Sequence, residues 1–121
     1  MSINTTFEHD IHTFIVRMPE NITLETLNFW GRKFLQSLTK NEKSALLLDT
    51  NKHQFESIEC LKLLREILSN EKIKNNISKF AFVQPRHYRE PNIINEKERY
   101  FNNFEDAYCW LQNNQLDKGT N

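Results

Sequence analysis

Glycine is scarce in this sequence of 121 residues, which contains Gly31 and Gly119 and no others. A glycine-rich phosphate loop and a dinucleotide-binding fingerprint each need several glycines within a few residues, so neither can be built and classical nucleotide binding loses most of its support. The two cysteines, Cys60 and Cys109, are too few for a disulfide framework. Both fall inside predicted helices at positions that look inward-facing, and we expect buried thiols rather than a bridge.

Neither sign of charge predominates, because 16 Lys and Arg residues balance 16 Asp and Glu residues. The chain therefore has no overall electrostatic attraction to nucleic acid or to an anionic membrane. Its longest apolar run, Ala45–Leu48, is far shorter than the roughly 20 residues that span a bilayer. The N-terminus also lacks the basic start and apolar middle of a signal peptide. We expect a cytoplasmic protein with no membrane insertion and no nucleic-acid partner.

The length suits one domain with a real core. We expect a single domain over residues 1–121, with its core at about 6–112 and a flexible polar tail over 113–121. Hydrophobic periodicity and capping residues divide the core into predicted strands and helices. The strands are expected at 6–8, 13–17, 45–49, 80–83 and 100–101, and the helices at about 24–38, 58–68 and 104–112.

Strands separated by helices need crossover connections, so the sheet must be at least partly parallel. The first two strands are joined by a short turn near Asp10 and should form an antiparallel hairpin. The run Ala45–Asp49 is apolar almost throughout, which is typical of a central strand buried on both faces. We therefore predict an α/β fold with a small mixed sheet of four to five strands, an N-terminal hairpin and about three flanking helices.

The end of the sequence carries the most specific pattern. Tyr100-Phe101 finishes a strand, Asn103 can cap the next helix, and Ala107 is followed by Trp110-Leu111. Together with the preceding hairpin, helix and buried strand ending in Leu48-Asp49, this pattern resembles the SpoIIAA-like branch of the STAS domain family over residues 6–112. The resemblance implies a four- or five-stranded sheet flanked by helices, no catalytic apparatus, and a regulatory role in bacterial signalling.

Ser57 lies where the anti-anti-sigma branch of that family carries a serine whose phosphorylation breaks partner binding. The surrounding residues are Glu56-Ser57-Ile58-Glu59, whereas that branch has Asp-Ser-Ser-Gly. A phosphate here would gain from the free amides of the helix but would be opposed by Glu56 and Glu59. The alternative, which ordinary capping preference favours, is that Ser57 only caps its helix.

Asp49 and His53 follow the buried strand, at the end where loops of parallel sheets commonly form ligand sites. A carboxylate–histidine pair is conceivable, but no nucleophile or oxyanion pocket is visible nearby. A role for Asp49 in the turn is the more common arrangement. Among the scattered histidines, His9 and His12 could approach each other across a turn, which is too few ligands for zinc. We therefore expect no enzyme, no metal and no cofactor.

A second candidate surface combines cations with an aromatic ring just after the fourth strand. Lys97 and Arg99 are close enough in sequence to join it. The nearby carboxylates of Glu90, Glu96 and Glu98 reduce its positive charge, which makes nucleic acid a less suitable ligand. The surface suits an anionic ligand or an acidic partner, although a solvated charged face is the more ordinary interpretation. Its residues are Arg86, His87, Tyr88 and Arg89.

Two functions from different classes fit these observations. The first is a non-enzymatic STAS-like regulatory or protein-interaction domain, acting through the surface around His53, Ser57 and Arg86–Arg89, with a homodimer as one candidate assembly. The second is a carrier or sensor of a small apolar or anionic, lipid-like ligand in a cleft between the sheet and the helices that carry Trp30 and Trp110. Phe29 and Trp30 are about 100 degrees apart on a helix, so at least one should face away from the core.

Overall fold

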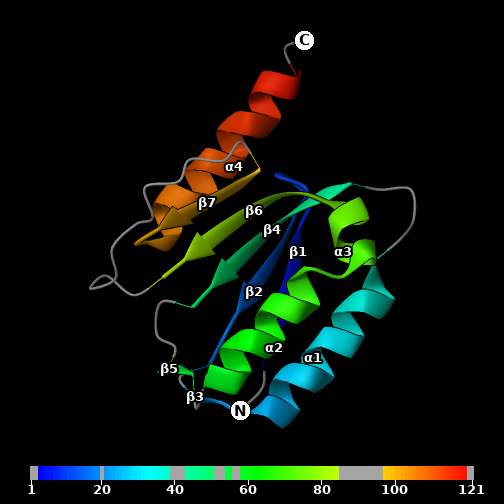
Figure 1. Ribbon diagram of the computed structural model, residues 1–121. Helices are drawn as coiled ribbons and strands as arrows, with labels where there is room; N and C mark the ends of the chain where they lie inside the picture. Colours follow the sequence, from blue (N-terminus) through cyan, green and yellow to red (C-terminus); the bar gives the residue numbers. More distant parts are fainter. Residues whose placement is uncertain are drawn as a thin grey trace.

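The computed structural model describes residues 3–19, 21–38, 43–50, 54–55, 58–84 and 97–119. These residues form a small α/β fold with a five-stranded sheet in the order β1-β2-β4-β6-β7 and a second sheet of β3 and β5 (Figure 1). The strands are β1 Asn4–Glu8, β2 Thr13–Arg17, β3 Asn21–Ile22, β4 Ser44–Asp49, β5 Gln54–Phe55, β6 Ile77–Val83 and β7 Glu98–Phe101. The helices are α1 Leu24–Ser37, α2 Ile58–Leu68, α3 Glu71–Asn76 and α4 Phe104–Gly119.

The main sheet is mixed in the way the sequence predicts. β1 pairs antiparallel with β2, whereas β2, β4, β6 and β7 pair parallel to one another. From β2 onward each strand is added on the same side of the previous one, so the order never reverses along the chain. Right-handed crossovers that advance in one direction place their helices on the same face of a sheet.

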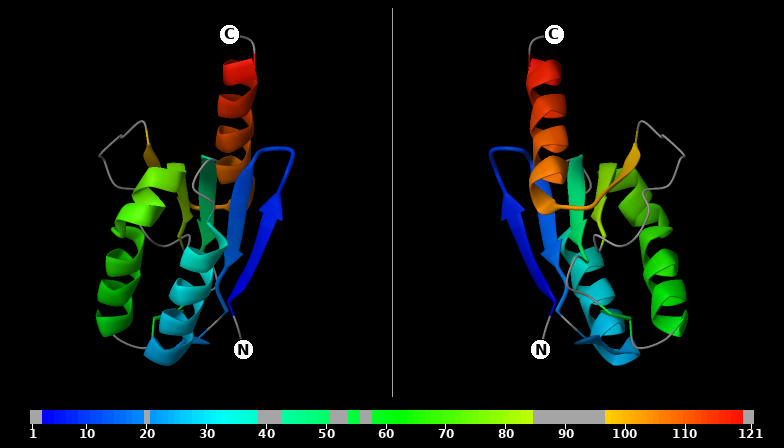
Figure 2. Two further views of the ribbon diagram at one scale, coloured as in Figure 1. Left: turned by 90° about the vertical axis from the view of Figure 1, so that its right-hand side faces the viewer. Right: turned by 90° about the vertical axis from the view of Figure 1, so that its left-hand side faces the viewer.

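β4 divides the core into two clusters because its side chains alternate between the faces of the sheet. Leu46 and Leu48 point into one cluster, together with apolar residues from α1, α2 and α3. Ala45 and Leu47 point into the other, which α4 closes with Ala107 and Leu111. Figure 2 shows α4 standing apart from the other three helices, as this division requires. The structure thus has three layers, with the sheet in the middle.

The β1–β2 hairpin turns through His12, whose φ of 49° lies in the left-handed region. Histidine is among the residues that occupy this region more often than most side chains. The main-chain N–H of His12 donates to the carbonyl of His9 at 3.3 Å and closes the turn. Phe7 and Phe14, which are paired across the hairpin, pack ring edge to ring face at 4.9 Å. The hairpin therefore continues the aromatic packing of the core.

Helix α1 matches its expected bounds closely. The Thr23 side chain accepts a hydrogen bond from the Thr26 amide at 3.1 Å, and the helix ends at Ser37 with Leu38 as its C-cap. Trp30 is buried, whereas Phe29 is 63% exposed, so the adjacent rings do face in different directions. Leu24, the first residue of α1, is 44% exposed although it is apolar. Its position in the first turn places it beyond the edge of the core.

Several features differ from the sequence-based prediction. Residues 54–55 form β5, which pairs with β3, within a segment expected to be a loop. Residues 71–76 form the separate helix α3. Asn70 caps this helix, because its side-chain carbonyl accepts a hydrogen bond from the Lys72 amide. Helix α4 continues to Gly119 through most of the segment expected to be a flexible tail. Cys60 is buried, as predicted, and its thiol donates to the Ile22 carbonyl at 3.6 Å. Cys109 is exposed instead, because the face of α4 toward the sheet is set by Ala107 and Leu111.

A close approach between helices α1 and α2 depends on a glycine. A Cβ atom at Gly31 would lie 2.8 Å from Cδ1 and 3.1 Å from Cγ1 of Ile67. Gly31 is buried, so this space is not open to solvent. The absence of a side chain therefore lets Ile67 of α2 pack directly against the backbone of α1. No helix in the part of the chain that the structure describes is long and apolar enough to cross a membrane.

We expect Gly31→Leu to lower the free energy of unfolding by about 1–3 kcal/mol, because the added side chain overpacks the α1–α2 contact. The measurement is urea unfolding followed by circular dichroism. Gln36→Leu, which adds the same side chain at an exposed position of α1, is the matched control and should have little effect. Combining Gly31→Leu with Ile67→Ala should recover part of the loss. Equal stabilities for Gly31→Leu and the control would contradict the proposed contact.

Candidate functional site at the carboxyl edge of the sheet

The carboxyl ends of β2, β4, β6 and β7 lie along one edge of the main sheet, which we call the carboxyl edge. The strands end there at Arg17, Asp49, Val83 and Phe101. Helices α1, α2 and α4 begin at this edge, where the small β3–β5 sheet also lies (Figure 1). The N-termini of three helices therefore gather near the ends of four strands, and the positive ends of their helix dipoles lie on this side of the molecule.

Asp49, a predicted site residue, is the last residue of β4 and is half-buried. Its carbonyl accepts a hydrogen bond from the Met18 amide at 3.0 Å. Its neighbour in the register is Arg17 of β2, so the carboxylate and the guanidinium project from the same face of the sheet. The Arg17 guanidinium lies 4.8 Å from the ring centroid of Phe104, the first residue of α4. The structure thus brings a carboxylate, a guanidinium and an aromatic ring together.

Thr50 ties the strand ends together just beyond Asp49. Its amide donates to the carbonyl of Val83 at 2.8 Å, and its hydroxyl donates to the same carbonyl at 2.7 Å. The Gln84 amide donates to the carbonyl of Phe101 at 2.9 Å. These bonds extend the ladder by one residue on two strands. Hydrogen bonds therefore join the ends of β4, β6 and β7 at the carboxyl edge.

The start of α4 is capped as the sequence predicts. The Asn103 side-chain carbonyl accepts from the Asp106 amide at 2.8 Å, and the Asn103 amide group donates to the Asp106 carboxylate at 2.9 Å. Asp106 and Glu105 also place negative charge in the first turn, where the helix dipole favours it. This reciprocal cap fixes α4, and with it Phe104, at the carboxyl edge.

Most of the remaining predicted site residues cannot be compared with the structure. They lie outside the described residues, and they are His53, Ser57, Arg86, His87, Tyr88 and Arg89. Among the described neighbours, Ile58 begins α2 and Gln84 follows β6. Their candidate roles stay predictions.

The two histidines of the hairpin lie in one turn, as expected, but at the opposite edge of the sheet from Asp49. Both imidazoles contact the ring of Phe7 edge-on, with centroid distances of 4.9 Å for His9 and 5.2 Å for His12. Nearby, partial burial together with the charges of Glu8 and Asp10 raises the pKa of Tyr108. Among the residues with described positions, no three His, Cys, Asp or Glu side chains are grouped so that they could hold a metal ion.

The two tryptophans lie on opposite faces of the sheet. Trp30 belongs to the cluster under α1 and α2, where its indole N–H donates to the Thr5 hydroxyl at 2.8 Å. Trp110 belongs to the α4 cluster, where its ring centroid is 5.8 Å from that of Phe101. One cleft cannot be lined by both rings. A ligand pocket between the sheet and the helices would therefore have to use one tryptophan alone.

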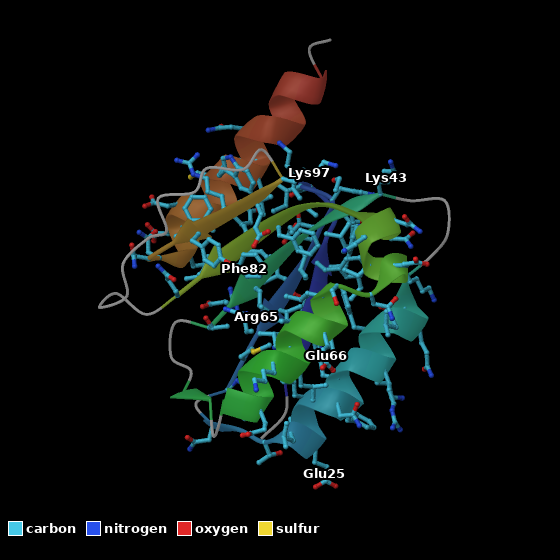
Figure 3. The ribbon with its side chains drawn as sticks, viewed as in Figure 1. Glu25, Lys43, Arg65, Glu66, Phe82 and Lys97 are labelled. Atoms are coloured by element: carbon cyan, nitrogen blue, oxygen red, sulfur yellow. The ribbon has the colours of Figure 1, made fainter. Side chains whose placement is uncertain are left out.

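A row of three aromatic rings, which the sequence pattern alone did not indicate, lies on the face of the sheet that carries α2. Phe80 and Phe82 are stacked at 6.1 Å on β6, and Phe82 is stacked on Tyr100 of β7 at 4.9 Å. We call these three residues the aromatic row. Figure 3 shows Phe82 on the side of the sheet where α2 carries Arg65. The sequence alone places Phe80 and Phe82 on one face of a strand. Their neighbour Tyr100 is set by the β6–β7 register, which the sequence does not indicate.

Tyr100 is half-buried at the end of this row, and its hydroxyl donates to the Glu98 carboxylate at 3.1 Å. Burial raises the pKa of Tyr100, and both the charge of Glu98 and the hydrogen bond to it act in the same direction, while Arg65 acts weakly against them. The phenol is therefore held in its neutral, donating form.

Comparison with models of known protein families gives no match, and no curated protein shows significant sequence similarity to this chain. A function for this chain must therefore be inferred from the arrangement of its described residues.

We expect Asn103→Ala to lower the free energy of unfolding by about 1 kcal/mol, because the Asp106 amide loses its capping acceptor. Thermal and urea unfolding would measure the change. The matched control is Asn113→Ala, which removes the same side chain from an exposed position within α4 and should leave stability unchanged or slightly higher. A loss of the same size in both variants would show that the cap contributes nothing specific.

We also expect Tyr100 to titrate above its ordinary pKa of about 10. Because the folded-state pKa is raised, Tyr100 contributes stability that is complete below the unfolded pKa and is lost as the pH rises through the folded pKa. NMR titration of tyrosine ring carbons would follow the group, and Tyr100→Phe would assign its signal. Glu98→Gln should lower the pKa of Tyr100 without restoring the ordinary value, since burial is the largest cause. An unchanged pKa in Glu98→Gln would contradict this account.

Proposed function

We propose that this protein is a non-enzymatic, STAS-like regulatory domain that binds a protein partner through its carboxyl edge. The observation that supports this proposal best is the convergence at that edge of Asp49, Arg17 and the N-termini of three helices. The convergence offers charged side chains of both signs beside the positive ends of three helix dipoles. Such a surface suits a polar protein partner, because complementary charges give specificity and fix the register of an interface.

The organisation of the described edge favours binding over catalysis. Thr50 and Asn103, which could otherwise act on a substrate, have their side chains committed to the Val83 carbonyl and to the α4 cap. In open α/β sheets, ligand crevices form where the strand order reverses. The described strands advance in one direction from β1 to β7 and contain no such reversal. A surface for recognition fits this topology better than a deep pocket.

The candidate switch fits the same surface. Ser57 immediately precedes α2 in the sequence, and α2 begins at the carboxyl edge. Phosphorylation there would add negative charge beside an edge that already carries Asp49 and the exposed Glu59. In this proposal the added charge releases a partner that recognises the unmodified edge. If Ser57 serves only as a cap, the edge binds its partner constitutively.

We expect wild-type protein, purified untagged from its own source cells, to appear in native mass spectrometry as a complex with a second polypeptide. Asp49→Arg should lose the complex, because the substitution places two cations side by side at the end of β2 and β4. Asp49→Asn should weaken it. Glu66→Arg is the matched control, since it makes the same charge reversal at an exposed position of α2 (Figure 3).

Circular dichroism of each variant separates a lost interface from a lost fold. The proposal would be contradicted by bare protein in every preparation, or by a complex that survives both Asp49 variants. A bound small molecule in place of a polypeptide would instead favour a ligand carrier. One added phosphate that maps to Ser57 and is absent from the complex would support the switch.

A further inference from the structure

β7 is an edge strand of the described sheet, with β6 as its neighbour on one side. The Lys97 carbonyl accepts from the Phe80 amide at 2.7 Å, and the Phe101 carbonyl accepts from the Gln84 amide at 2.9 Å. In a parallel ladder, alternate residues direct both their N–H and their C=O to the same neighbour. The main-chain groups of Glu98 and Tyr100 therefore point away from β6. Their direction is the one in which a further strand would pair with β7.

The side of β7 that faces α4 is basic. Lys97 and Arg99 alternate with Glu98 along the chain, so both cations project from the α4 face. Lys79 of β6 lies on the same face, because it is two residues before Ala81, the register partner of Arg99. The Lys79 ammonium is 5.3 Å from the ring centroid of Trp110, and the Arg99 guanidinium is 5.5 Å from that of Phe101. The rings hold these cations beside the edge strand.

The opposite side of β7 is largely aromatic. Tyr100 ends the aromatic row, and its hydroxyl engages the Glu98 carboxylate. A side chain that lay beside Tyr100 from an added strand would meet a ring face and a carboxylate. An apolar or aromatic side chain gains from the ring, whereas an acidic side chain would be repelled by Glu98. The two sides of β7 thus favour different residues on an added strand.

We infer that the outer edge of β7 binds an extended segment of another protein by strand addition. Acidic and apolar residues alternate along this bound segment. The main-chain groups of Glu98 and Tyr100 supply the pairing, and the alternating side chains supply the specificity, as in other complexes formed by strand addition. Acidic side chains meet Lys97 and Arg99, and apolar side chains meet Tyr100. Pairing of β7 with a second copy of itself is disfavoured, because the cations of the α4 face would then oppose one another.

This surface is separate from the proposed partner site at the carboxyl edge, and its test does not depend on that site. The probe is a fluorescein-labelled peptide of sequence Gly-Glu-Val-Glu-Val-Glu-Gly, with binding followed by fluorescence anisotropy. We expect full-length protein to bind it at least about tenfold more tightly than the same peptide with Lys in place of Glu. N-methylation of the central Glu and the two Val amides should abolish binding, because it removes main-chain donors without changing charge.

Charge reversal tests the specificity. Lys97→Glu combined with Arg99→Glu should invert the preference, so that the Lys peptide binds more tightly than the Glu peptide. The matched control combines Lys62→Glu with Lys72→Glu, two exposed positions on α2 and α3, and should keep the original preference. An inverted preference also shows that the reversed variant is folded, since an unfolded protein would bind neither peptide.

Amide hydrogen exchange locates the added strand. We expect the bound Glu peptide to slow exchange at Glu98 and Tyr100 more than at the β1 amides. Equal affinity for the Glu and Lys peptides, undiminished binding of the N-methylated peptide, or tighter binding of an oligothymidylate than of the Glu peptide would each overturn the inference. The last two results would identify a charge-driven surface that does not use strand pairing.

Discussion

Burial of β4 on both faces is the constraint on which the rest of the fold depends. A Leu side chain contributes roughly 1.5–3 kcal/mol when it is fully buried, and this strand buries three of them. Leu46 and Leu48 need a cover on one face of the sheet, and Leu47 needs one on the other. A sheet with a single helical layer would leave one of these faces in water. The three-layer arrangement follows from the composition of six residues, Ser44–Asp49.

The two covering layers are unequal because the strand order never reverses. Crossovers from β2 to β4 and from β4 to β6 advance in the same direction, so α1, α2 and α3 share one face. The last helix must then cover the other face alone. Ala107 and Leu111 fill the cluster around Leu47, and the reciprocal bond between Asn103 and Asp106 sets where α4 begins. The same connectivity places three helix N-termini at the carboxyl edge, so the candidate interaction site is a consequence of the chain's path.

Local patterns are predictable from this sequence, whereas strand registers are not. The apolar run of β4 and the Asn103 cap each depend on residues within a few positions, and each lies where expected. β3 and β5 are two residues each and pair across a long separation in the chain, so no local pattern indicates them. Asp49 could be identified as a site residue because it ends a buried strand, but its proximity to Arg17 depends on the β2–β4 register. The periodicity of a strand shows which side chains share a face. Which residues of two strands lie side by side depends on the packing of the whole sheet.

The two edge strands of the described sheet, β1 and β7, differ in charge. This difference affects which partners each strand can pair with. β1 presents uncharged Thr5 and Thr6, and the Trp30 indole fixes Thr5 to α1 by a hydrogen bond. β7 is shorter and carries Glu98 and Arg99 on opposite sides. Charges on an edge strand disfavour pairing with a second copy of the same strand, and natural sheets use them for that purpose. The repulsion that prevents self-association at β7 is also an attraction for a strand of the opposite charge pattern, so one set of side chains provides both protection and selectivity.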